Sequence, residues 1–66
     1  MYSDSLKQQT RKHFKTMPFA AMKQFGGKFG IGVLRDGKYI ITDRKTAEKY
    51  CYKSMDALIE ANWAID

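Results

Sequence analysis

The sequence predicts a small single α+β domain over residues 1–66, with the element order α-β-β-β-α and helices on one face of a three-stranded antiparallel sheet. Three observations support this fold class. The N-terminal segment carries apolar residues at helical spacing, an Asp-Gly dipeptide joins two strand-like runs, and a serine precedes a short apolar segment near the C-terminal end. With 44% hydrophobic residues, the chain can bury one core.

The N-terminal segment is predicted to be a helix that ends or kinks near residues 15–17, so that Pro18 splits it. Serine and aspartate at positions 3–5 are suited to cap its start. Pro18 removes a backbone donor and disfavours helical angles at Met17. We expect a second short helix after Pro18, ended by Gly26-Gly27. The predicted apolar positions of the first helix are Leu6, Thr10, His13, Phe14 and Met17, and those of the second are Phe19, Met22 and Phe25.

Residues 31–35 and 38–42 are predicted to form a β-hairpin around Asp36-Gly37, because this dipeptide favours the type I′ turn that matches the twist of paired strands. The register places Arg35 opposite Lys38. One face would carry Ile31, Val33 and Ile40, and the other would carry Leu34, Tyr39 and Ile41. Both faces are partly apolar, so the pattern does not decide which face meets the helices.

The segment Glu48–Lys53 alternates in the manner of a third antiparallel strand, with Tyr50 and Tyr52 on one side. A helical turn that begins at Thr46 is the alternative. Ser54 is predicted to cap a last helix that runs to about Ala64, with its apolar side formed by Met55, Leu58, Ile59 and Trp63.

The charge is unevenly distributed along the chain. All 12 Lys and Arg residues lie within residues 1–53, and residues 54–66 contain three acids and no base. The formal net charge is +5 at pH 7. A small domain with this cationic body is expected to have an anionic partner.

The sequence contains no motif that specifies a reaction, so we expect neither an enzyme nor a cofactor, a metal site or a small-molecule substrate. The glycine-rich run over residues 26–32 lacks the GxxxxGK[ST] pattern of a phosphate-binding loop. His13 has no acid three or four residues away, and Cys51 is the single cysteine. The start of the chain does not resemble a signal peptide, and no apolar run approaches a membrane span. We therefore expect a cytoplasmic, reducing location and no membrane contact.

The predicted element order resembles that of double-stranded-RNA-binding domains. In that family the last helix opens with a lysine-rich turn that grips phosphate, whereas here the equivalent segment, Ser54–Ala57, is neutral to acidic. The stretch Gly30–Ala61 is also similar to the DNA-binding domains of phage integrases, which lay a three-stranded sheet in the major groove. Both resemblances are based on element order, and both imply a nucleic-acid partner.

The predicted function is therefore nucleic-acid binding, DNA or RNA, through a basic helix face and the turns of the sheet. The candidate contact residues are Lys7, Arg11, Lys12 and Lys15 on the helix, Arg35, Lys38, Arg44 and Lys45 at the turns, and Tyr50 and Tyr52 as stacking aromatics. The alternative is a regulator or inhibitor of the type that phages and mobile elements encode. Such a protein would dock its basic face on an acidic protein surface, or pair its edge strand with a partner or in a homodimer.

Overall fold

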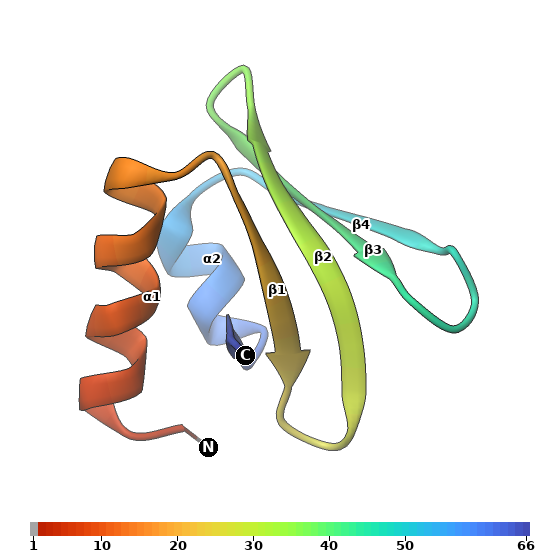
Figure 1. The fold of residues 1–66 in the computed structure, drawn as a ribbon, viewed down its shortest axis with the longest axis horizontal. Coiled ribbons are helices and arrows are strands. Elements are labelled where there is room, and N and C mark those ends of the chain that lie inside the picture. The colour runs from red at the N-terminus through yellow and green to blue at the C-terminus, as the bar shows by residue number, and fades with distance from the viewer. Residues whose placement is uncertain (1) are drawn as a thin grey trace.

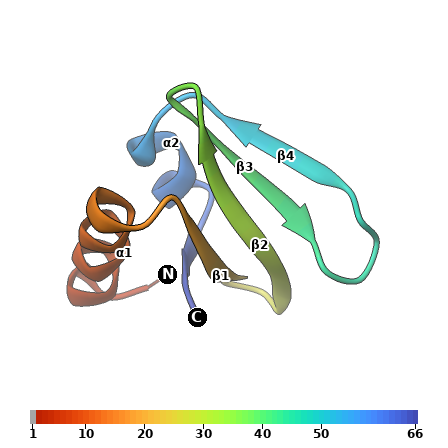
Figure 2. The same ribbon diagram turned by 45° about the horizontal axis from the view of Figure 1, so that its top comes forward.

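The computed structural model describes residues 2–66, which fold into a five-stranded antiparallel sheet and two helices (Figure 1). The strand order is β4-β3-β2-β1-β5. Both helices lie on the same side of the sheet (Figure 2), which confirms the α+β class. The predicted order α-β-β-β-α is wrong, because the sheet has two more strands. The elements are α1 (Asp4–Thr16), β1 (Phe19–Gln24), β2 (Lys28–Arg35), β3 (Lys38–Asp43), β4 (Lys49–Tyr52), α2 (Met55–Glu60) and β5 (Trp63–Ile65).

Helix α1 has the predicted start and end. The Ser3 hydroxyl accepts a hydrogen bond from the Leu6 N–H at 3.2 Å, which satisfies one of the free donors of the first turn. At the other end Met17 is extended, with φ −128° and ψ 133°, as expected for the residue before a proline.

The predicted second helix is wrong, since the residues after Pro18 form strand β1. Ala20 and Met22 are buried whereas Phe19 and Ala21 are exposed, which is the alternation of a strand. Strand β1 pairs with β2 on one side and with β5 on the other, so tertiary pairing outweighs the helical tendency of alanine and methionine here. Gly26-Gly27 is a hairpin turn with φ of +118° and +107°.

The β2–β3 hairpin has the predicted register, with Arg35 opposite Lys38 and Val33 opposite Ile40. Asp36 and Gly37 both have positive φ, 52° and 75°, as a type I′ turn requires. The third predicted strand is also confirmed, because β4 pairs antiparallel with β3. The alternative of a helix from Thr46 is wrong, since residues 47–48 are not helical and β4 begins at Lys49.

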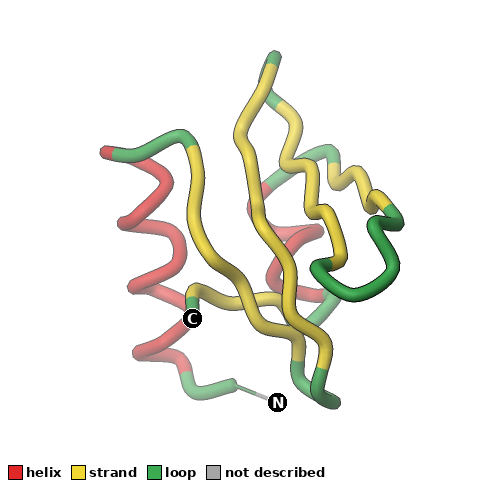
Figure 3. The backbone as a smooth tube through the Cα atoms, turned by 45° about the vertical axis from the view of Figure 1, so that its right-hand side comes forward, coloured by secondary structure: helices red, strands yellow, loops and turns green. Residues whose placement is uncertain are grey.

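The last predicted helix is too long. The Ser54 hydroxyl accepts from the Ala57 N–H at 3.1 Å and caps α2 as expected, but the helix ends at Glu60. Asn62 then adopts a left-handed φ of 67°, and the chain returns as β5 beside β1, with Trp63 opposite Gln24. Figure 3 shows this short last strand joining the sheet.

The core lies between the two helices and the sheet. Its buried side chains are Phe14, Ala20, Met22, Ile41, Leu58 and Trp63. Phe14 meets Tyr39 edge to face, with 5.3 Å between the ring centroids. The hairpin face with Leu34, Tyr39 and Ile41 is therefore the one that meets the helices, and no described helix covers the opposite face of β1–β4.

Candidate functional site

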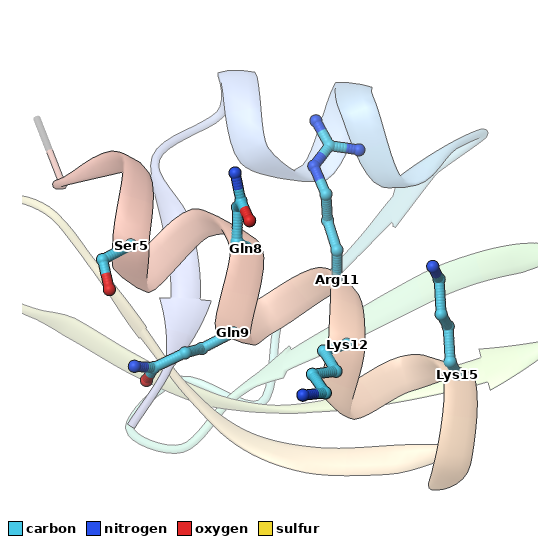
Figure 4. Close-up of a pocket in the computed structure, with 6 residues that line it drawn as sticks. All are labelled: Ser5, Gln8, Gln9, Arg11, Lys12 and Lys15. Atoms are coloured by element: carbon cyan, nitrogen blue, oxygen red, sulfur yellow. The ribbon is translucent and has the colours of Figure 1, made fainter.

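The four candidate cations of α1 share one helix on the outside of the molecule. Figure 4 shows Arg11 and Lys15 extending to one side of α1, with Arg11 directed toward α2, whereas Lys12 extends to another side. Arg11 forms an ion pair with Asp56 at 2.6 Å. Within residues 2–66, no other lysine or arginine has such a pair, so Lys7, Lys12 and Lys15 keep their charge available to a partner.

A hollow of about 630 Å³ lies along this helix (Figure 4). All the residues that line it belong to α1: Ser5, Gln8, Gln9, Arg11, Lys12 and Lys15. It is thus the space between side chains on one helix surface, with no second element to enclose a ligand. This geometry suits a chain of phosphates that lies along the surface better than a buried small molecule.

Arg44 and Lys45 lie where two turns meet at one end of the sheet. The Arg44 N–H donates to the Phe29 carbonyl at 2.9 Å and so joins the β3–β4 turn to the start of β2. A second hollow, of about 600 Å³, lies between this turn and the Gly26-Gly27 turn, and Lys28 contributes a third cation to its lining. Sequence reasoning missed Lys28, because its proximity depends on how the two turns pack.

Asp43 holds the β3–β4 turn in shape. Its Oδ1 accepts hydrogen bonds from the backbone N–H groups of Lys45 at 2.7 Å and Thr46 at 3.1 Å. These two bonds, aided by the charges of Lys28 and Lys45, hold the pKa of the Asp43 carboxyl below its usual value. Asp43 thus stays ionised and fixes the backbone that carries Arg44 and Lys45.

Arg35 and Lys38 lie opposite each other at the far end of the same strands, beside the β2–β3 turn. Strand β3 separates them from Arg44 and Lys45 by about 20 Å at the usual rise per residue. The candidate cations therefore form three groups, on α1 and at the two ends of the sheet. The structure does not bring them together into one continuous surface.

Tyr50 and Tyr52 point toward the helices and are half-buried. The Tyr52 hydroxyl accepts a hydrogen bond from the Trp63 indole N–H at 3.0 Å. The Tyr50 ring lies 6.3 Å from the Trp63 ring, and the Lys28 ammonium lies 5.5 Å from the Tyr50 centroid. Both tyrosines pack at the rim of the core, so the geometry gives no support to the predicted stacking role.

The side of β1–β4 that no described helix covers, which we call the open face, includes the predicted hairpin face of Ile31, Val33 and Ile40. Phe19, Phe29, Ile31 and Val33 are 54%, 48%, 41% and 40% exposed there. Sequence reasoning missed Phe19 and Phe29 on this face, because it placed Phe19 in a helix and began the first strand at Ile31. From the strand registers, the side chains of the open face are Phe19, Ala21, Lys23, Phe29, Ile31, Val33, Arg35, Lys38, Ile40, Thr42, Lys49 and Cys51.

Among residues 2–66, no three His, Cys, Asp or Glu side chains are grouped so that they could hold a metal ion. Neither described helix has the length and apolar character needed to cross a bilayer. No protein-family model matches the chain, and neither the curated proteins nor the solved structures include a significant match to it.

Proposed function

We propose that this protein is a non-catalytic module that binds nucleic acid through its cationic side chains. The observation that carries the proposal is the lack of internal neutralisation: the part of the chain that the structure describes contains one ion pair, Arg11–Asp56. The remaining described lysines and arginines have no acidic partner within salt-bridge distance, so their charge can be neutralised by phosphates. The hollow along α1, open and lined by cations and amides, is consistent with that role.

Two of the three groups of cations supply the proposed phosphate contacts. On α1, Lys12 and Lys15 extend to different sides, so Lys7, Lys12 and Lys15 contact phosphates along more than one side of the helix. Arg44 and Lys45 contact phosphates at the end of the sheet, where Asp43 fixes their turn. Contacts of this kind position the nucleic acid without reading its sequence. We therefore expect affinity to fall steeply with salt.

Binding measured by anisotropy with labelled single-stranded and double-stranded DNA and RNA, over a series of salt concentrations, tests the proposal. Replacing Lys7, Lys12 and Lys15 together by Gln should weaken binding and flatten the slope of log affinity against log salt by about one unit for each phosphate that is no longer neutralised. Failure of the wild-type protein to bind any of the four nucleic acids would refute the proposal.

The Arg11–Asp56 pair supplies a matched pair of charge variants. Arg11→Gln removes a cation from α1, and Asp56→Asn removes the acid that neutralises it. We expect weaker binding for the first variant and tighter binding for the second, because the Asn variant leaves Arg11 free. An unchanged affinity in both variants would exclude this part of α1 from the interface.

The second candidate function is a regulator that binds an acidic protein surface, as phage-type inhibitors do. Strand β4 favours it, because β4 is an outer strand of the sheet and one side of its backbone has no partner strand. A partner strand could add there. A pull-down with nuclease treatment separates the two functions: a protein retained after digestion favours this candidate, and recovery of nucleic acid alone favours the first.

A further inference from the structure

The open face exposes a contiguous group of large apolar side chains. Phe19 and Val33 lie directly opposite each other on β1 and β2, and Ile40 continues the row on β3. The next row contains Ala21, Ile31 and Thr42. Contiguous exposed apolar surface of this kind marks a place where something binds.

The charged side chains that the strands place on this face are all positive. Arg35 and Lys38 form a pair at one end, Lys49 lies on the β4 side, and Lys23 lies opposite Phe29. No acidic side chain of the strands shares this face, because Asp43, the one acid within β1–β4, lies opposite Gly30 and is buried on the helix side. An occupant that combines apolar surface with negative charge would complement this face.

Single-stranded nucleic acid has this combination, since each nucleotide pairs a flat base with a phosphate. We propose that the open face binds unpaired bases, with Phe19 and Phe29 as stacking platforms and Lys23, Arg35, Lys38 and Lys49 as phosphate contacts. Base–aromatic stacking on a sheet flanked by cations is an established physical mode of single-strand binding. This inference rests on the proposed function and adds a substrate class to it.

The arrangement of the two rings fits a strand that crosses the sheet. Phe29 and Val33 are four residues apart on β2, about 13 Å at the rise of a strand, and Phe19 lies beside Val33. The rings therefore stack on bases that are not adjacent, and Ile31 and Val33 supply apolar contact between them. In a duplex the faces of the bases are already stacked on one another, so these rings discriminate against duplex.

The test compares two kinds of replacement at the same exposed positions. The double variant Phe19→Leu/Phe29→Leu keeps apolar surface and removes the π faces, whereas Phe19→Trp/Phe29→Trp keeps them. With oligo(dT) and oligo(rU) of about twelve nucleotides, we expect the Leu variant to bind at least roughly fivefold more weakly and the Trp variant to bind as well as wild type. Circular dichroism checks that each variant is folded.

Two spectroscopic and chemical readouts report on the face directly. The single tryptophan, Trp63, is 1% exposed on the helix side. In the Phe19→Trp/Phe29→Trp variant the two introduced indoles are therefore the exposed reporters, and single strands should quench their fluorescence. Cys51 is a free, exposed thiol in the same row as Ile40 and Val33. Bound oligonucleotide should slow its alkylation by iodoacetamide, and a duplex of the same length should not.

The outcomes distinguish this inference from the function on which it rests. If no nucleic acid binds the wild-type protein, both fail. If single strands and duplex bind equally and the Leu variant behaves as wild type, nucleic-acid binding stands and the role of the open face is refuted. If the protein alone sediments as a dimer that Val33→Lys converts to a monomer, the face is a contact between copies, and the inference is again refuted.

Discussion

The hydroxyl of Thr10 joins α1 to the backbone of Ile65. Its Oγ1 accepts a hydrogen bond from the Ile65 N–H at 3.1 Å and donates one to the Leu6 carbonyl at 2.9 Å. Thr10 is fully buried, so nothing else can satisfy the Ile65 donor if the hydroxyl is removed. This contact covers the outer edge of β5 with a helix.

Replacing Thr10 by Val keeps the shape of the side chain and leaves the Ile65 N–H without an acceptor. We expect the free energy of unfolding to fall by about 1–3 kcal/mol, the cost of an unsatisfied buried donor. Urea denaturation followed by Trp63 fluorescence measures it. Thr10→Ser is the matched control, since it keeps the hydroxyl and loses one methyl group, and it should cost about 1 kcal/mol. A Val variant more stable than the Ser variant would contradict the role of the hydrogen bond.

Two buried glycines of β2 differ in what an added methyl group would meet. A Cβ at position 30 would lie 2.7 Å from the carbonyl oxygen of Thr42, which is backbone of the paired strand. A Cβ at position 32 would lie 2.9 Å from Cδ1 of Ile41 and 3.0 Å from Cγ of Met22, which are side-chain atoms that can shift. We expect Gly30→Ala to cost more than Gly32→Ala.

Both costs should fall within the range of about 1–3 kcal/mol that overpacking incurs, with Gly30→Ala at the upper end. Thermal and urea denaturation of the two variants, made side by side, measures the difference. If Gly32→Ala were the less stable variant, the paired backbone of β2 and β3 would adjust to an added methyl group more easily than the side chains of Ile41 and Met22.

The lowered pKa of Asp43 makes the stability of the fold depend on pH in the acidic range. The pKa of Asp43 is lower in the folded protein than in the unfolded chain. Ionised Asp43 therefore stabilises the fold fully when the pH is above the unfolded-state pKa of about 4. That contribution is lost as the pH falls through the folded pKa. We expect the melting temperature of the Asp43→Asn variant to respond less than that of wild type to a fall in pH below about 4. If the melting temperatures of the two proteins fell equally with pH, the charge of Asp43 would not stabilise the turn.

The Arg11–Asp56 ion pair should contribute little to stability. The side chains are 44% and 74% exposed, so water and salt screen their attraction. We expect Arg11→Gln and Asp56→Asn each to change the free energy of unfolding by no more than about 1 kcal/mol. Chemical denaturation checks this value. A larger loss would mean that the two variants report on folding as well as on nucleic-acid binding.

Local signals in the sequence predicted about half of the fold. Pro18 set the end of α1, Asp36-Gly37 set the hairpin and its register, and Ser54 marked the start of α2. These features depend on a few neighbouring residues, so the sequence alone suffices. Strand β1 could not be predicted in this way, because its alanines and methionine favour a helix and only its two neighbouring strands make it extended.

Strand β5 was missed for a different reason. Three residues are too few to show a period, and Trp63 fitted the apolar side of a continued helix. Asn62 was the available signal, since asparagine tolerates the left-handed conformation that ends a helix. The candidate cations were assigned to the correct helix and turns. Their division into three groups, and the exposure of Phe19 and Phe29, depended on the sheet order, which the sequence did not reveal.

The covering of β5 by α1 has a consequence for how copies of this protein can assemble. A sheet extends into a fibre only when each copy has an unpaired outermost strand on both sides, so that it can pair with the copy before it and the copy after it. In this protein α1, through Thr10, covers the outermost strand β5, and among the described strands only β4 has an unpaired side. Two copies that paired through their β4 strands would leave no unpaired strand, so growth by strand addition stops at a dimer.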